Sequence, residues 1–208
     1  MTNREMLERY QKLPLGNICD ANGKTGCMTS SLRPLNAQCK VAGFAYPVKG
    51  KPGDNLAIHR AIYDAPAESV LVIDTDGYCG AGHFGEIMAT ACQERNIAGL
   101  VIDGSVRDAD DIQALKFPVF ARGLNANGTG KDFLGELNVP IRCGGVAVEP
   151  GDVVVGTCDG VAVIPRENAQ EVLLKAEAIA FKEDRVVQEL REGKTTLEIY
   201  RFAKLEEK

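Results

Sequence analysis

One turn of this sequence concentrates charge directly after an apolar run, in GLVIDGSVRDADD at residues 99–111. Arg107 keeps its positive charge and offers a planar fork of donors, which suits a carboxylate or a developing enolate oxygen. Asp108 offers the hard oxygen ligand that Mg²⁺ binds through one carboxylate, with waters and substrate oxygens in the other positions; Mn²⁺ fits equally. The alternative is a surface ion pair at a helix start, where acids such as Asp110 and Asp111 are favoured without any ligand.

Three glycines precede this turn in the pattern GxGxxG, at Gly80, Gly82 and Gly85. Asp103 follows 18 residues after the last of them, which is the spacing of a dinucleotide-binding loop. Glu86 argues against that hypothesis, because it places a negative charge at the helix N-terminus where a pyrophosphate would lie. Free N–H groups at the same helix start suit a small oxyacid, so we keep dinucleotide binding only as an alternative.

The elements around these residues predict a strand, helix, strand unit, made by SVLVIDTDG, GEIMATACQERN and GLVIDG. Such a crossover implies parallel strands that are buried on both faces. The glycine loop and the Arg107–Asp108 pair both follow C-terminal strand ends, so they can share one crevice. Further strands are expected in QCKVAGFAYPVKG and PVFARG, and antiparallel hairpins in CGGVAVEPGDVVVGTCDGVAVIPRE.

Helices are predicted at both ends of the chain. MTNREMLERYQKL and LPLGNICDANGK form the first two, and Asp54 can cap a helix that carries His59. Residues 167–192 form a long closing helix. We therefore predict an α/β fold: one compact sandwich domain over residues 1–208, with a parallel βαβ core, an antiparallel hairpin-rich half and a long C-terminal helix.

Composition excludes several classes of protein. The net charge is −5, and the 24 basic residues are scattered among 29 acidic ones, so no basic stripe is expected to bind nucleic acid. The apolar runs are shorter than the roughly 18 residues of a membrane span, and the polar start MTNREMLERY is no signal peptide. We expect a cytoplasmic protein that has no membrane partner.

The cysteines and histidines give no metal motif. Seven cysteines, an odd number without a CxxC pair, argue against a zinc site and a disulfide framework, so we expect small buried thiols. His83 in the glycine loop is the candidate for lining a pocket, whereas we expect His59 to be packed or capped. Turn aspartates are expected to cap backbone groups: Asp20, Asp74, Asp76, Asp103 and Asp159.

The stretch DTDGYCGAGHFGEIMATACQERNIAGLVIDGSVRDADDI, together with VEPGDVVVGTCDGVAVIP, resembles the RraA-like family. That family includes 4-hydroxy-4-methyl-2-oxoglutarate and 4-carboxy-4-hydroxy-2-oxoadipate aldolases. The resemblance extends from about residue 18 to residue 192 and implies a sandwich that assembles into homotrimers or hexamers, with sites at subunit boundaries. It matches Gly85, Glu86, Ile87 and Met88 to the substrate-binding loop, Arg107 to the substrate arginine and Asp108 to the metal ligand.

The family has a ribonuclease-regulator branch, a non-catalytic binding module that lacks the metal-binding aspartate and the long final helix. This sequence has both features. In the aldolases that helix brings an acid into a neighbouring subunit's site, and spacing from Arg107–Asp108 assigns this role to Glu183. Glu177 and Asp184 lie on the same helix and remain alternatives.

The resemblance implies a divalent-metal-dependent class II pyruvate aldolase that cleaves 4-hydroxy-2-oxo diacids. The metal and Arg107 would stabilise the pyruvate enolate, and water held by Glu86 and Glu183 would take the C4 hydroxyl proton. Oxaloacetate decarboxylation passes through the same enolate and is also expected. The alternatives are a non-catalytic regulatory binding trimer and a dinucleotide-binding protein.

Overall fold

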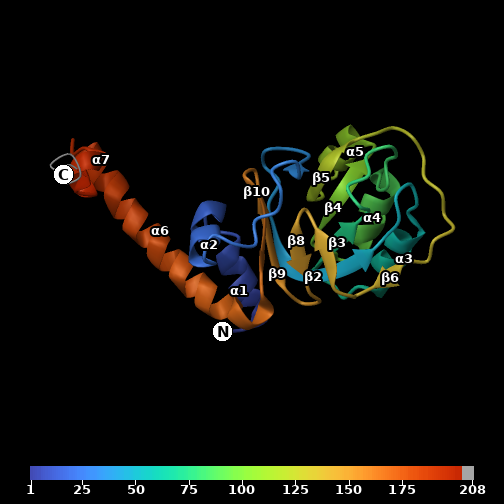
Figure 1. Ribbon diagram of the computed structural model, residues 1–208, viewed down its shortest axis with the longest axis horizontal. Coiled ribbons are helices and arrows are strands. Elements are labelled where there is room, and N and C mark those ends of the chain that lie inside the picture. The colour runs from blue at the N-terminus through green and yellow to red at the C-terminus, as the bar shows by residue number, and fades with distance from the viewer. Residues whose placement is uncertain (203–208) are drawn as a thin grey trace.

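The computed structural model describes residues 1–202 and is built on one mixed β-sheet (Figure 1). The strand order is β1-β5-β4-β3-β2-β9-β10, with β6 paired to β2; β2 to β5 run parallel and the others pair antiparallel. A separate antiparallel hairpin contains β7 and β8. The bounds are β1 Arg33–Pro34, β2 Val41–Lys49, β3 Ser69–Asp74, β4 Gly99–Val106, β5 Val119–Leu124, β6 Glu136–Leu137, β7 Ile141–Cys143, β8 Val146–Val148, β9 Val153–Thr157 and β10 Gly160–Ile164.

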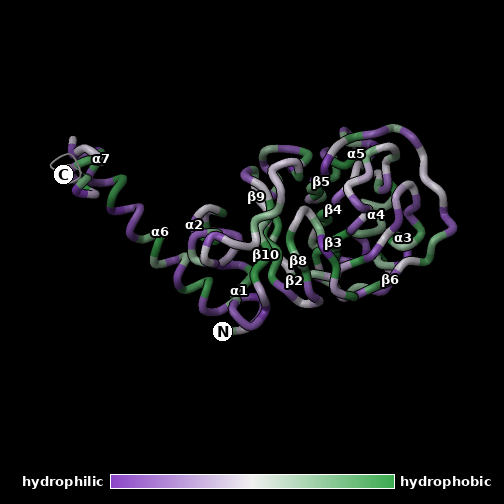
Figure 2. Tube along the Cα trace, viewed as in Figure 1, coloured by the Kyte–Doolittle hydropathy of each residue, from purple (hydrophilic) through white to green (hydrophobic). Residues whose placement is uncertain are grey.

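The central strands are buried on both faces. Every residue of β3 and β4 is buried, as expected of parallel strands that read as continuous apolar runs. Three helices cover one face: α3 (Leu56–Asp64), α4 (Glu86–Glu94) and α5 (Ala109–Ala114). The β7–β8 hairpin packs on the other face, and Figure 2 shows apolar residues concentrated along the strands between the two layers. The predicted βαβ core is confirmed.

A second group of helices lies at the opposite end of the molecule. α1 (Asn3–Tyr10), α2 (Leu15–Ala21) and the start of α6 (Ala169–Arg191) enclose a third apolar cluster against β9 and β10. A 3-10 turn, Arg166–Asn168, precedes α6, so the predicted long helix is confirmed with a slightly later start. Figure 1 shows α6 leaving the body and ending near α7 (Thr196–Ile199).

The fold class is confirmed as a mixed α/β sandwich with an antiparallel hairpin half and a long C-terminal helix. The last part of the predicted domain, residues 203–208, lies outside the described residues. None of the helices within residues 1–202 is long and apolar enough to cross a membrane.

The cysteine prediction is wrong at four positions. Cys19 and Cys27 form a disulfide with a Cα–Cα distance of 6.5 Å, and Cys79 and Cys158 are exposed. The bond forms because Cys27 lies in a β-bridge with Ala162, which holds it beside the end of α2, a tertiary contact that spacing does not reveal. Three thiols are buried as predicted: Cys39, Cys92 and Cys143. Burial raises the pKa of Cys92 to about 12.

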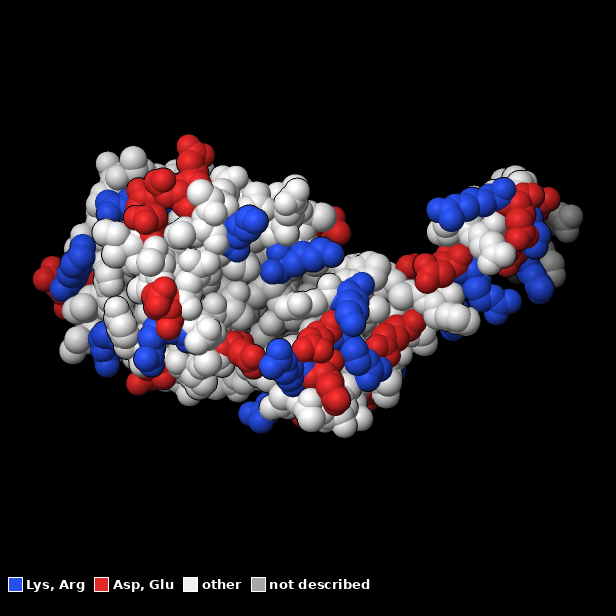
Figure 3. All heavy atoms as spheres, turned by 180° about the vertical axis from the view of Figure 1, so that it is seen from behind, with Lys and Arg blue, Asp and Glu red and all other residues white. Residues whose placement is uncertain are grey.

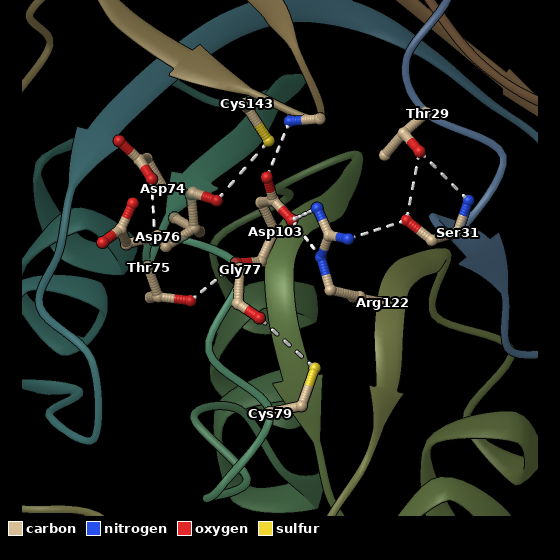
Figure 4. Close-up of polar contacts among 12 residues, drawn as sticks. Thr29, Ser31, Asp74, Thr75, Asp76, Gly77, Cys79, Asp103, Arg122 and Cys143 are labelled. Atoms are coloured by element: carbon tan, nitrogen blue, oxygen red, sulfur yellow. Dashed lines mark hydrogen bonds and ion pairs between the residues drawn. The ribbon is translucent and has the colours of Figure 1, made fainter.

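The turn aspartates divide into two groups. Asp74 accepts from the backbone N–H of Asp76, and Asp103 from that of Gly144, as predicted (Figure 4). Asp103 also pairs with Arg122, which donates to Ser31. For Asp20, Asp76 and Asp159 the prediction is wrong, because their carboxylates accept no backbone hydrogen bond among residues 1–202.

Candidate active site

A cavity of about 200 Å³ lies beside the C-terminal ends of β3 and β4 and collects most of the predicted site residues. Its lining comprises Asn55, His59, Gly82, Gly85, Ile87, Met88, Arg107, Asp108, Gly128, Thr129 and Lys131. A larger hollow of about 320 Å³ near Glu68 and Arg166 contains none of the predicted site residues. The crevice predicted between the glycine loop and the Arg107–Asp108 pair is therefore present.

The glycine loop continues alongside β4 as a short extended segment. Gly82 and Ser105 form a parallel bridge, the N–H of Arg107 donates to the Phe84 carbonyl at 2.9 Å, and the N–H of Glu86 donates to Asp108 Oδ2 at 3.2 Å. These bonds place the N-terminus of α4 directly against the Asp108 carboxylate. Helix N-termini attract negatively charged groups, so the carboxylate and the start of α4 stabilise each other's position.

Gly82 and Gly85 lie so close to Arg107 and Asp108 that a side chain at either position would clash. A Cβ added at Gly82 would lie 2.7 Å from Arg107 Cβ, and one added at Gly85 would overlap Asp108 Oδ2. The glycine spacing thus reflects packing against this chain's own atoms, which at Gly82 also include the Asn125 carbonyl oxygen, whereas a dinucleotide loop uses glycine to let the backbone approach a pyrophosphate. This packing argues against the dinucleotide alternative.

Asp108 has a left-handed backbone conformation, with φ 55° and ψ 41°. A non-glycine residue in this region costs on the order of 1 kcal/mol, and such residues cluster at functional sites. The carboxylate makes no capping bond to its own helix α5 and lies 3.6 Å from Arg107 Nε. Both side chains line the cavity and are about 40% exposed, at 43% and 39%. The predicted ion pair therefore exists, but it faces a cavity.

The two histidines lie in each other's expected surroundings: His59 lines the cavity, and His83 is packed inside the protein. His59 lines the cavity next to Lys131, and burial, with a smaller contribution from that lysine, lowers the pKa of His59. His83 is fully buried beneath the glycine loop, so the prediction that it lines the pocket is wrong. The bridge between Gly82 and Ser105, and the bond from the His83 N–H to the Ser105 carbonyl, hold this segment along β4, where the His83 ring is enclosed.

Sequence analysis missed four lining residues, Asn55, Gly128, Thr129 and Lys131. Asn55 is 7% exposed; its Nδ2 donates to the His83 carbonyl at 3.0 Å, while its Oδ1 has no hydrogen-bond partner among residues 1–202. A buried acceptor without a donor is costly, so this atom suits a ligand hydroxyl or a metal-bound water. The only sequence signal for Lys131 is its position in the glycine-rich segment NGTGKD.

Asp54 supports this side of the cavity. It was predicted to cap α3, and its Oδ1 accepts from the N–H of Leu56 at 3.0 Å although Asn55 occupies the cap position. Its Oδ2 accepts from the N–H of Asp132 at 2.7 Å. One carboxylate therefore fixes both the start of α3 and the segment that carries Lys131.

The predicted acids are not all brought together within one chain. Glu86 opens α4 beside Asp108, but Glu183 lies on the exposed part of α6, at the opposite end of the molecule from α3 and α4 (Figure 1). Residues 1–202 contain no cluster of three or more His, Cys, Asp or Glu side chains that could hold a metal. Asp108 is the one carboxylate among the lining residues, and Glu86 does not line the cavity. A single carboxylate fits Mg²⁺ or Mn²⁺, which retain bound water, better than it fits a structural zinc ion.

Charge on the surface is mixed. Figure 3 shows acidic and basic side chains interspersed over one face, without a continuous basic area on that face. Nucleic-acid phosphates require clustered Lys and Arg. Lys and Arg side chains do not form such a cluster on this face.

Comparisons with known proteins agree with the geometry. The sequence profile of the RraA-like family, described as Aldolase/RraA, matches residues 16–163. A Halalkalibacterium halodurans protein, whose name provisionally assigns it as a 4-hydroxy-4-methyl-2-oxoglutarate aldolase, is 40% identical over 83% of this chain and 82% of its own length.

Solved structures have the same fold. An uncharacterized protein from Pseudomonas syringae pv. tomato superposes with a TM-score of 0.87 at 27% identity, covering 97% of this chain and 95% of its own. The RNA-processing inhibitor RraA from Thermus thermophilis gives 0.68 at 22% identity, covering 74% and 93%. With most of the chain matched by the family profile, this protein is a member of the RraA-like family.

Proposed function

We propose that this protein is a divalent-metal-dependent class II pyruvate aldolase. Its substrates are 4-hydroxy-2-oxo diacids of the 4-hydroxy-4-methyl-2-oxoglutarate type, which it cleaves to pyruvate and a second oxo acid, and it also decarboxylates oxaloacetate. The observation that carries the proposal is the joint presence of Arg107, Asp108 and the N-terminus of α4 around one cavity. The name of the Halalkalibacterium halodurans relative supports the same reaction.

Arg107 and the first turn of α4 bind the substrate. Within the loop formed by Gly85, Glu86, Ile87 and Met88, the N–H groups of Glu86 and Met88 already donate to Asp108 and to the Gly85 carbonyl. The guanidinium and the backbone N–H groups of Gly85 and Ile87 therefore provide the donors for the carboxylate and keto oxygen of a 2-oxo acid. Lys131 adds a second positive charge to the lining, so a dicarboxylate fits the cavity better than a monocarboxylate does.

Asp108, with water completing the shell, would hold Mg²⁺ or Mn²⁺. When bound, such an ion stabilises negative charge on the oxygens of the 2-oxo acid as the carbon–carbon bond breaks. Arg107 donates hydrogen bonds to the same developing charge, and it stays protonated throughout.

Proton transfer needs a base near the C4 hydroxyl. Glu86, which opens α4 next to the lining residues Gly85 and Ile87, would position a water for this step, and Glu183 would be supplied by a second copy of the chain. The assembly is a homotrimer or hexamer in which α6 of one copy packs on its neighbour. Exposed apolar residues on the projecting part of α6, including Phe181 at 65% exposure, support such packing.

The test is pyruvate release from 4-hydroxy-4-methyl-2-oxoglutarate and from oxaloacetate. We expect turnover with Mg²⁺ or Mn²⁺, and its loss with a chelator or in Asp108→Ala. Asp110→Ala is the matched control, because Asp110 opens the same helix but does not line the cavity. A folded, metal-loaded wild-type protein that releases no pyruvate from either substrate would contradict the proposal and favour the regulatory binding trimer.

A further inference from the structure

His83 makes two side-chain contacts beneath the glycine loop. Its Nε2 accepts from the backbone N–H of Gly53 at 3.0 Å, and its Nδ1 lies 3.2 Å from the Ser105 carbonyl oxygen. An acceptor at Nε2 and a donor at Nδ1 define one state of the ring, the neutral tautomer that carries its proton on Nδ1. A protonated ring would direct a second N–H at the N–H of Gly53.

The main chain of His83 adds two further bonds. Its N–H donates to the Ser105 carbonyl at 2.9 Å, and its own carbonyl accepts from Asn55 Nδ2 at 3.0 Å. One residue therefore joins the start of α3, the glycine loop and the end of β4. Each of these segments supplies part of the cavity lining, namely Asn55, Gly82 with Gly85, and Arg107 with Asp108.

We propose that His83 is a positioning residue of the active site: its neutral imidazole fixes the glycine loop and the start of α3 relative to Arg107 and Asp108. The inference rests on the proposed function. His83 does not line the cavity, so it acts through the residues that it holds and not by contact with substrate.

The surroundings of the ring maintain the neutral state. The groups that face the His83 ring are the Asp54 carboxylate, the Tyr78 ring and the backbone of Ala81 and Ser105. The Tyr78 and His83 rings meet edge to face, with their centroids 5.8 Å apart. Burial lowers the pKa of His83, and this effect exceeds the opposing influence of the Ser105 carbonyl and of Asp54. Asp54 is already bonded to two backbone N–H groups.

The first test is nitrogen-15 NMR of the imidazoles in the full-length protein. The chain has only two histidines, so the loss of one set of signals in His83→Phe assigns the ring. We expect a neutral Nδ1–H tautomer that persists as the pH falls through about 6.5, the ordinary histidine value. A ring protonated on Nε2, or one that titrates at the ordinary value, would overturn the proposal.

The second test separates the two contacts. His83→Gln can retain an acceptor toward Gly53, and His83→Asn can retain a donor toward Ser105, whereas His83→Phe removes both. We expect faster amide hydrogen exchange at Gly53 in His83→Phe and His83→Asn, with protection largely retained in His83→Gln. Unchanged exchange at Gly53 in all three variants would contradict the positioning role.

Binding and kinetics complete the design. With Mg²⁺ present, we expect oxalate, which mimics the pyruvate enolate, to bind His83→Phe about tenfold more weakly, because misplaced groups lose orientation. kcat for oxaloacetate should fall more than KM rises, with partial recovery in His83→Gln. Wild-type oxalate affinity and kinetics in a folded His83→Phe would overturn the inference. Absence of turnover in the wild-type protein would instead contradict the proposed function, and the NMR and exchange results do not depend on turnover.

Discussion

The glycine loop and helix α6 each carry predicted site residues, but the fold supports them in different ways. The loop is buried from Ala81 to Gly85 and is hydrogen-bonded to Ser105 in β4, to Asn127 and to the side chain of Asn55, the cap residue of α3. α6 is buried only near its start, at Ala169, Val172, Leu173 and Ala176, and the part that carries Glu183 is exposed. One chain therefore determines the position of Arg107 and Asp108, whereas the proposed role of Glu183 requires a second copy of the chain.

Glu183→Gln is expected to have the largest effect on activity and tests the α6 side of the comparison. We expect kcat to fall by about 10²- to 10⁴-fold, the usual contribution of positioned proton transfer, while oxalate binding persists. Glu171→Gln is the control, because Glu171 is an exposed acid on the same helix whose partner is Lys175.

A mixing experiment extends the Glu183 prediction. Co-assembly of Glu183→Gln with Asp108→Ala chains should restore part of the activity, because some sites then combine an intact Asp108 with an intact Glu183 from the neighbour. Mixed assemblies that remain as inactive as either parent would show that Glu183 does not act across subunits.

Gly85→Ala tests the loop side of the comparison. Its Cβ would overlap Asp108 Oδ2, so we expect kcat/KM to fall by about 10²-fold and the free energy of unfolding by about 1–3 kcal/mol. Gly16→Ala in α2 is the matched control: a Cβ there meets nothing within 4 Å, and alanine should stabilise the helix by about 1 kcal/mol or less. Equal activity of the two variants would contradict the packing argument.

Reduction of the Cys19–Cys27 disulfide should lower the stability of the end of the molecule that carries α6, and ligand binding at the glycine loop should be unchanged. Chain entropy gives about 2.5 kcal/mol as the maximum contribution of so short a closed segment. The backbone bonds of Met28 and Val163 in the same region keep part of the structure in place. Thermal unfolding with and without dithiothreitol, compared with Cys19→Ser, measures the effect; loss of oxalate binding on reduction would show that the two regions are coupled.

Acidification should produce the smallest of these effects, a modest decrease in the free energy of unfolding. The folded-state pKa values of His59 and His83 are both lowered, so the unfolded chain takes up these protons first as the pH falls. The contribution of the two histidines to the free energy of unfolding is fully present above about pH 6.5, the ordinary histidine pKa. It is lost as the pH falls below that value and through the folded-state pKa values. Urea unfolding of the wild-type protein and His83→Phe between pH 8 and 5 should show a shallower dependence in the variant.

Much of the site was predictable because its signals are local. The apolar runs of β3 and β4 and the acid and glycine residues that follow them are properties of short segments, and parallel pairing then brings Arg107 and Asp108 to the glycine loop. The inward orientation of His83 was not predictable, because it follows from the pairing of Gly82 with Ser105. Asn55 and Lys131 reach the cavity through Asp54, which joins segments far apart in the sequence.

The assignments of Glu86, Arg107, Asp108 and Glu183 to catalysis remain predictions, as does a single domain over residues 1–208. The cavity explains how Arg107 and Asp108 could cooperate within one chain, whereas Glu86 contacts Asp108 through its backbone N–H and does not line the cavity.

The most direct test of the central claim is the rate of pyruvate formation from 4-hydroxy-4-methyl-2-oxoglutarate as Mg²⁺ is added back to metal-stripped protein. The account predicts negligible formation without metal, saturable recovery in the wild-type protein and in Asp110→Ala, and no recovery in Asp108→Ala. Full activity of the stripped protein, or equal recovery in Asp108→Ala, would contradict it.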